Sequence, residues 1–110
     1  MVCIDADIGW DWEAMERLLV FSTLYDSVSG VYCSRKDPAT FHLNLLEDQT
    51  DNNGLISHNG TGMGFTAIKR EVLEKMETPS YVHKDYEGRM KQFFKCEIQN
   101  DIYVGEDIYF

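Results

Sequence analysis

The sequence predicts a mixed α/β fold, a mixed sheet with flanking helices, formed by one domain over residues 1–110. Three observations predict this class. An apolar run at Met1–Ile4 ends abruptly at an acidic residue, which is typical of a buried strand. A stretch with helical spacing of apolar residues follows at about Trp12–Leu24. Further short apolar runs then alternate with turn residues across 28–68.

The first helix has a clear start. Asp11 precedes Trp12, and an aspartate in this position accepts hydrogen bonds from the first turn of a helix. Glu13 suits the positive end of the helix dipole. The residues at helical spacing that should face the core are Met15, Leu18, Leu19 and Ser22.

Strands and a hairpin are predicted next. Val28–Cys33 and Phe41–Leu46 have strand patterns. Asp51–Gly54 has the composition of a turn, so Leu55–His58 is expected to pair back as a hairpin. Gly60–Gly64 is expected to form a flexible corner.

The last part of the chain begins with another strand and helix. Phe65–Ile68 predicts a strand, and Lys69–Met76 a short helix with an apolar face. Thr78–Arg89 is polar and is predicted to be a loop. The apolar residues expected to reach the core are Val72, Leu73, Met76, Phe93, Phe94, Ile98, Ile102 and Tyr103.

Composition excludes several classes of protein. The 110 residues include 44% hydrophobic residues, enough for one core, which disfavours disorder. A net charge of −9 disfavours nucleic acid and anionic membranes as partners. No apolar run approaches the roughly 20 residues that a membrane span needs.

Three cysteines are spread widely along the chain. They form no C-x-x-C pair, which argues against a zinc ribbon. Cys3 and Cys33 lie in apolar runs and are predicted to be small core residues. An odd cysteine number without a signal peptide predicts reduced thiols and a cytoplasmic location.

Asp5-Ala6-Asp7 could hold a metal ion. Residues two apart in a strand point to the same side, so both carboxylates could share one cation. Carboxylates are hard ligands that favour Mn²⁺ or Mg²⁺ over zinc, and such a cation can neutralise a diphosphate leaving group. A solvated acidic turn before a helix is the alternative interpretation.

Two further motifs could contribute chemistry. Gly105-Glu106-Asp107 could supply a general base, although adjacent acids are also common as surface charge. Glycines in Gly60-Thr61-Gly62-Met63-Gly64 allow backbone to approach a ligand closely. Trp10 could stack on a sugar ring or pack at the corner between strand and helix.

The order of these motifs resembles a known family. Asp5-Ala6-Asp7-Ile8-Gly9-Trp10 is followed by Gly60-Thr61-Gly62-Met63-Gly64-Phe65, then Ile68-Lys69-Arg70 and finally Gly105-Glu106-Asp107. This set is similar to the carboxyl-terminal half of GT-A fold glycosyltransferases like those of family two, including phage and marine microbial members. The resemblance covers nearly the whole chain.

The resemblance implies a metal-dependent transfer from a nucleotide-diphospho-sugar to an unidentified acceptor. Asp7 would be the main ligand of Mn²⁺ or Mg²⁺, and Asp5 would contact the donor or the metal. Asp107 would be the catalytic base, with Glu106 beside it. Gly60, Thr61 and Gly62 would line the binding site for the donor sugar and the acceptor. Trp10 would also contact the sugar.

The chain also departs from the family. The family's nucleotide-binding half is absent, and Cys33-Ser34 stands where relatives have a proline. We therefore expect a fragment of a longer domain, with little activity alone and an exposed strand edge that promotes a homo-oligomer. Two alternatives remain: a non-enzymatic α/β assembly or binding module, and a metal-dependent phosphoryl-transfer or nuclease-like protein.

Overall fold

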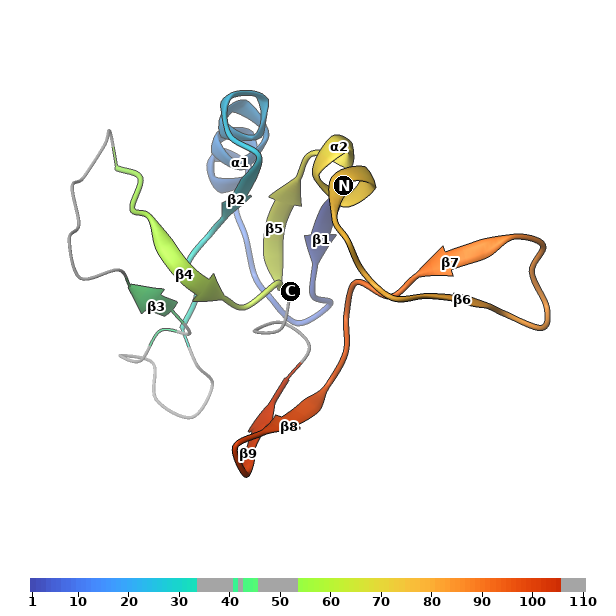
Figure 1. Ribbon diagram of the computed structural model, residues 1–110. Helices are drawn as coiled ribbons and strands as arrows, with labels where there is room; N and C mark the ends of the chain where they lie inside the picture. Colours follow the sequence, from blue (N-terminus) through green and yellow to red (C-terminus); the bar gives the residue numbers. More distant parts are fainter. Residues whose placement is uncertain (34–40, 42, 46–53, 106–110) are drawn as a thin grey trace. The chain divides into compact units, whose positions relative to one another are not determined.

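The computed structural model describes residues 1–33, 41, 43–45 and 54–105, and it confirms the mixed α/β class (Figure 1). Contacts divide the chain into unit 1, Met1–Lys69, and unit 2, Arg70–Phe110. In unit 1 the elements are β1 (Val2–Ile4), α1 (Trp12–Leu24), β2 (Ser27–Ser29), β3 (Leu43–Leu45), β4 (His58–Thr61) and β5 (Phe65–Ile68). In unit 2 they are α2 (Arg70–Lys75), β6 (Ser80–Val82), β7 (Arg89–Lys91), β8 (Glu97–Gln99) and β9 (Ile102–Val104). Neither helix in these described segments is long and apolar enough to cross a membrane.

The main sheet of unit 1 has the strand order β1-β5-β2. Val2 pairs with Ala67, and Ala67 in turn pairs with Val28, so β5 is antiparallel to both neighbours. The sequence predicted a mixed sheet, but all strand pairs in the described segments are antiparallel. The reason is that β5 inserts between the two strands that α1 connects, and it runs in the opposite direction to both.

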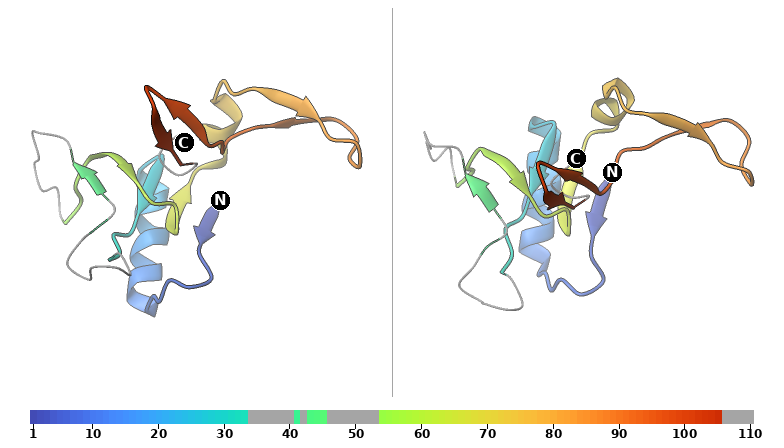
Figure 2. Two further views of the ribbon diagram at one scale, coloured as in Figure 1. Left: turned by 90° about the horizontal axis from the view of Figure 1, so that it is seen from below. Right: turned by 60° about the horizontal axis from the view of Figure 1, so that its bottom comes forward.

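Helix α1 has the predicted bounds and the predicted cap. The Asp11 carboxylate accepts a hydrogen bond from the backbone N–H of Ala14 at 2.7 Å. The helix contacts β2 and β5 and lies along one face of the sheet (Figures 1 and 2). Leu18 is buried as expected, but Leu19 is 45% exposed, because it projects from the side of the helix rather than toward the sheet.

Strand β5 supplies the centre of the core. Phe65 and Ala67 pack with Leu18 of α1. Thr66 points to the opposite face of the sheet, where its hydroxyl hydrogen-bonds to Ser29 of β2 at 2.8 Å. All four residues of β5 are buried, as expected of a central strand.

The β3–β4 hairpin lies later in the sequence than predicted. The returning strand is His58–Thr61 rather than Leu55–His58, with Leu43 opposite Thr61 and Asn44 opposite Gly60. Gly60 and Thr61 therefore belong to a strand, and only Gly62–Gly64 form a turn outside it. A backbone ladder needs no side chain, so Gly60 does not prevent pairing.

Cys33 corrects another prediction. None of the three cysteines forms a disulfide, and Cys33 is exposed, whereas Cys3 is half-buried in β1. Cys33 lies beyond the end of β2, where it makes one isolated bridge to Phe41. Val31 and Cys33 are exposed, whereas Tyr32 between them packs against the core.

Helix α2 follows β5 in the chain and matches the predicted helix at its centre. Its residues Val72 and Leu73 are half-buried, whereas Glu71, Glu74 and Lys75 are exposed. The exposed face carries ion pairs one turn apart, between Arg70 and Glu74 at 2.7 Å and between Lys75 and Glu71 at 3.6 Å. Such pairs stabilise a helix by a few tenths of a kcal/mol each, about 0.2–0.5.

The predicted loop at Thr78–Arg89 contains a strand instead. Ser80–Val82 pairs with Arg89–Lys91 as the β6–β7 hairpin. The Arg89 guanidinium donates to the Ser80 hydroxyl at 2.8 and 3.0 Å and to the Ser80 carbonyl at 3.2 Å. Polar side chains join the two strands of this hairpin. The sequence therefore lacks the alternation of apolar and polar residues that would have predicted a strand.

The β8–β9 hairpin turns through Asn100 and Asp101, which have positive φ of 51° and 64°. Two consecutive residues with positive φ are the signature of the type I′ hairpin turn. Ile98, Ile102 and Tyr103 are exposed, between 67% and 74%. The prediction that they reach the core is wrong, because within the described residues this ladder has two strands and no third strand covers it.

Lys91 caps the carboxyl end of α2, which yields the first testable prediction. Its ammonium donates to the carbonyls of Leu73, Glu74 and Met76 at 3.2, 2.7 and 3.0 Å. We expect Lys91→Met to lower the free energy of unfolding of unit 2 by about 1–2 kcal/mol, because three carbonyls lose a charged donor. Urea unfolding would measure this, with Lys84→Met in the β6–β7 turn as the control. Equal losses in both variants would contradict the capping role.

Candidate functional site

The Asp5-Ala6-Asp7 motif lies in a turn directly after β1. The backbone N–H of Ile8 donates to the Asp5 carbonyl at 3.2 Å, which closes the turn. The prediction that both carboxylates extend from one strand is therefore wrong, because the chain bends at Asp5. Both side chains are nevertheless exposed and close in sequence. The turn is fixed to β5 by a hydrogen bond from the Asp5 N–H to the Gly64 carbonyl at 2.9 Å.

A glycine turn at Gly62–Gly64 lies against this acidic turn. The backbone N–H of Gly64 donates to the Tyr32 hydroxyl at 3.1 Å. A Cβ atom on Gly64 would lie 2.7 Å from an Asp5 carboxylate oxygen and 2.9 Å from the Tyr32 hydroxyl. A Cβ atom on Gly62 would overlap the same hydroxyl. The Asp5 carboxylate and the Tyr32 hydroxyl thus lie against the backbone of the glycine turn, where Gly62 and Gly64 have no room for a side chain.

Sheet topology explains why these residues meet. Ile4 pairs with Phe65 and Ser29 pairs with Thr66, so the carboxyl ends of β1 and β2 share an edge with the start of β5. The residues that follow β1 and β2 therefore lie beside those that precede β5. Tyr32 was missed by the sequence analysis, because no local spacing relates it to a glycine turn 30 residues later.

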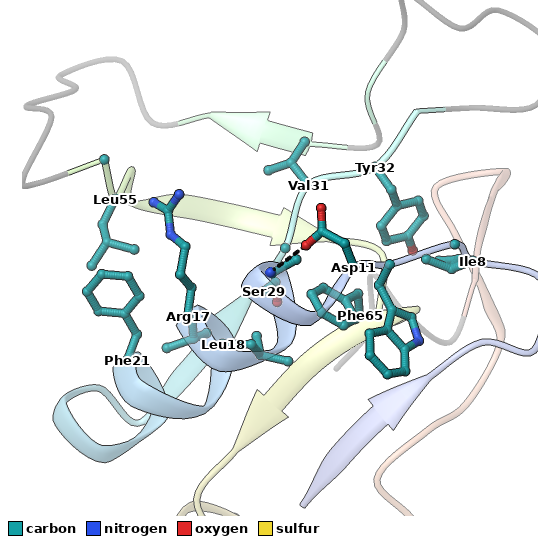
Figure 3. Close-up of a pocket in the computed structure, with 16 residues that line it drawn as sticks. Ile8, Asp11, Arg17, Leu18, Phe21, Ser29, Val31, Tyr32, Leu55 and Phe65 are labelled. Atoms are coloured by element: carbon teal, nitrogen blue, oxygen red, sulfur yellow. Dashed lines mark hydrogen bonds between the residues drawn. The ribbon is translucent and has the colours of Figure 1, made fainter.

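Trp10 lines a different feature, a cavity of about 700 Å³ beside α1 (Figure 3). Asp5 and Asp7 are not among its lining residues, whereas Tyr32 is. The loop after β1 thus contributes its acids to the turn beside Gly64 and its tryptophan to the cavity. The predicted contact of Trp10 with a sugar stays a prediction.

The other predicted site residues do not all lie at the acidic turn. Gly60 lies in β4, with nothing within 4 Å of the position that a Cβ atom would take. Thr61 ends β4 and lines a second cavity of about 520 Å³ with His58. Of these neighbours, Gly62 contacts Tyr32 next to the acidic turn. Glu106 and Asp107 lie outside the described residues, and their roles as catalytic groups stay predictions.

The acidic turn offers two carboxylates as possible metal ligands. In the described segments, no group of three or more His, Cys, Asp or Glu side chains could hold a metal. Mg²⁺ and similar hard cations often bind through one or two carboxylates, with waters and substrate phosphates as the other ligands. Two carboxylates such as those of Asp5 and Asp7 would suffice for that kind of binding, and a Mn²⁺ or Mg²⁺ site here stays a prediction.

Comparisons with known proteins gave no relative for this chain: no family model, curated protein or solved structure matches it. The resemblance to glycosyltransferases therefore depends on the order of the sequence motifs. The site described above depends on the geometry of unit 1.

Proposed function

We propose that this chain takes part in metal-dependent glycosyl transfer from a nucleotide-diphospho-sugar to an acceptor hydroxyl. The proposal is supported chiefly by the contact between the acidic turn and the glycine turn, at Asp5 and Gly64. Asp5 and Tyr32 follow the carboxyl ends of β1 and β2, which lie at one edge of the sheet, so both side chains reach the same glycine turn.

Each group would have a separate role. Asp7 would be the main ligand of Mn²⁺ or Mg²⁺, with Asp5 contacting the donor or the same ion. The bound cation would neutralise charge on the diphosphate leaving group. The hydrogen bond from the Asp5 N–H to Gly64 holds the backbone of the acidic turn in place, so the backbone needs little reordering on binding. Asp107, with Glu106 beside it, would accept the proton of the acceptor hydroxyl, and Trp10 would stack on a sugar ring.

Calorimetric titration with Mn²⁺ and pyrophosphate tests the metal role, because the diphosphate is common to all such donors. We expect millimolar affinity, about −4 kcal/mol. Asp7→Asn should weaken it by about tenfold or more, because ligand charge sets the affinity of such sites. Zn²⁺ should bind no better than Mn²⁺.

Asp26→Asn is the matched control, since Asp26 is also an exposed aspartate of unit 1 and instead pairs with Lys69 at 3.4 Å. Both substitutions change the net charge equally, so a general electrostatic effect would weaken binding equally. Equal affinity in wild type and Asp7→Asn would refute the role of Asp7.

The alternative, a non-enzymatic assembly module, is favoured by one observation. Strand β1 pairs with β5 on one side, and no strand within the described segments pairs with its other side. Val2 and Ile4 on this strand are 43% and 38% exposed. An unpaired edge with exposed apolar side chains promotes pairing with another chain.

We therefore expect two copies of the chain to associate through β1, and Val2→Lys to shift them to monomers. A lysine on an edge strand opposes pairing because its charge would be buried between the copies. Light scattering measures the mass, with Leu24→Lys on the exposed face of α1 as the control. A monomeric wild type, or a dimer that persists in Val2→Lys, would contradict association through this edge.

A further inference from the structure

The cavity beside α1 has walls that are mostly apolar. Its volume of about 700 Å³ lies within the range of small-molecule sites, about 300–1,000 Å³. It lies between α1, the chain that follows β2, and Leu55 (Figure 3). The apolar side chains that line it include Ile8, Leu18, Phe21, Val31, Leu55 and Phe65.

Most polar side chains of this cavity already have partners within the protein. The Ser29 hydroxyl is directed to the other face of the sheet, where it hydrogen-bonds to Thr66. The Tyr32 hydroxyl accepts from Gly64, and the Asp11 carboxylate caps α1. These groups are held in place by the fold, so they are poorly placed to bind the polar part of a ligand.

Arg17 is different. It is the lining residue that carries a positive charge, and no carboxylate in the described segments pairs with it. Figure 3 shows its guanidinium extending from α1 beside Phe21 and Leu55, at the opposite end of the cavity from Ile8 and Tyr32. In a chain with a net charge of −9, the Arg17 guanidinium is a positive charge next to an apolar surface, and the Asp11 carboxylate that also lines the cavity is bound to the start of α1.

We infer that this cavity binds a small amphiphilic ligand, with an aromatic or other apolar body between α1 and Val31 and one anionic group at Arg17. A guanidinium matches carboxylate and phosphate groups with two parallel hydrogen bonds, so either head group fits. The inference does not depend on glycosyl transfer, because neither Asp5 nor Asp7 lines the cavity.

Three probes with the same ring test the inference by calorimetry: 1-naphthyl phosphate, 1-naphthoate and neutral 1-naphthol. We expect at least one anion to bind the full chain about tenfold or more tightly than naphthol, because it adds a charged contact. The tighter of the two anions identifies the head group. Arg17→Met keeps the apolar stem and should reduce the affinity for the anions to that for naphthol.

Two further variants complete the test. Lys69→Met removes a positive charge from unit 1 outside the cavity, so it should leave anion binding unchanged. Val31→Trp should weaken all three probes, because the larger side chain occupies the cavity; Val31 is exposed, so folding should persist, which circular dichroism verifies. The inference is overturned if no probe binds wild type at millimolar concentration, if naphthol binds as tightly as both anions, or if Arg17→Met binds anions like wild type.

Discussion

Leu18→Ala is expected to lower the free energy of unfolding of unit 1 by about 2–5 kcal/mol. Leu18 is 3% exposed and packs against Phe65 and Ala67 of β5. Removing its side chain would leave a cavity between helix and sheet that α1 can fill only by shifting. Small proteins are stable by about 5–15 kcal/mol in total, so this change would remove a large share.

Leu24→Ala is the matched control for this prediction. It makes the same substitution in the same helix at a residue that is 67% exposed. Leu and Ala both have high helix propensity, so a large difference between the two variants measures burial. Urea unfolding followed by circular dichroism gives both free energies. Similar losses for Leu18 and Leu24 would show that α1 does not pack on β5 through Leu18.

Gly62→Ala is expected to destabilise unit 1 by about 1–3 kcal/mol, the usual cost of inserting a methyl group without space for it. The new Cβ atom would overlap the Tyr32 hydroxyl. The φ angle of Gly62 is not positive, so the cost comes from the missing space rather than from the backbone conformation. Tyr32 can move only by losing its hydrogen bond from Gly64.

A double-mutant cycle isolates this contact. Tyr32→Phe alone should cost about 1 kcal/mol, because it leaves the Gly64 N–H without that acceptor. Combined with Gly62→Ala, it should cost less than the sum of both changes, because the overlapping hydroxyl has gone. Gly60→Ala has free space at its Cβ position and should cost little by comparison. Strictly additive losses would mean that Gly62 and Tyr32 do not touch.

Local signals made part of the fold predictable from the sequence. Asp11 caps α1 by a contact three residues away, so the start of that helix could be predicted. Phe65–Ile68 was predicted with the correct bounds because the glycines before it and the polar residues after it delimit an apolar run. Both elements depend on interactions within a few residues.

Pairing between distant strands was not predictable in this way. The order β1-β5-β2 depends on contacts between residues about 40 to 65 positions apart, such as Val2 with Ala67 and Val28 with Ala67. The β6–β7 hairpin is held by Arg89 and Ser80, which carry no periodic apolar signal. The exposure of Ile98 could not be predicted either, because an isolated hairpin and a packed strand have similar apolar patterns.

The same distinction applies to the candidate site. Asp5 and Asp7 are neighbours in sequence, so their association could be predicted, although the turn that holds them was not. The approach of Tyr32 to Gly62 and Gly64 depends on the folded sheet. The Asp5-Ala6-Asp7 motif could thus be read from the sequence, whereas the backbone hydrogen bond from Asp5 to Gly64 that fixes its position could be seen only in the folded chain.

Nuclear magnetic resonance of the ¹⁵N-labelled chain, titrated with Mn²⁺ in the presence of pyrophosphate, tests the proposed metal role most directly. Mn²⁺ broadens the signals of nearby amides, so it reports where the cation binds. We predict that the amides of Asp5–Ile8 and Gly64 broaden first, and that Asp7→Asn abolishes this selectivity. Broadening that begins at other acidic segments, such as Asp85 and Glu87, and leaves Asp5–Ile8 sharp would contradict the account.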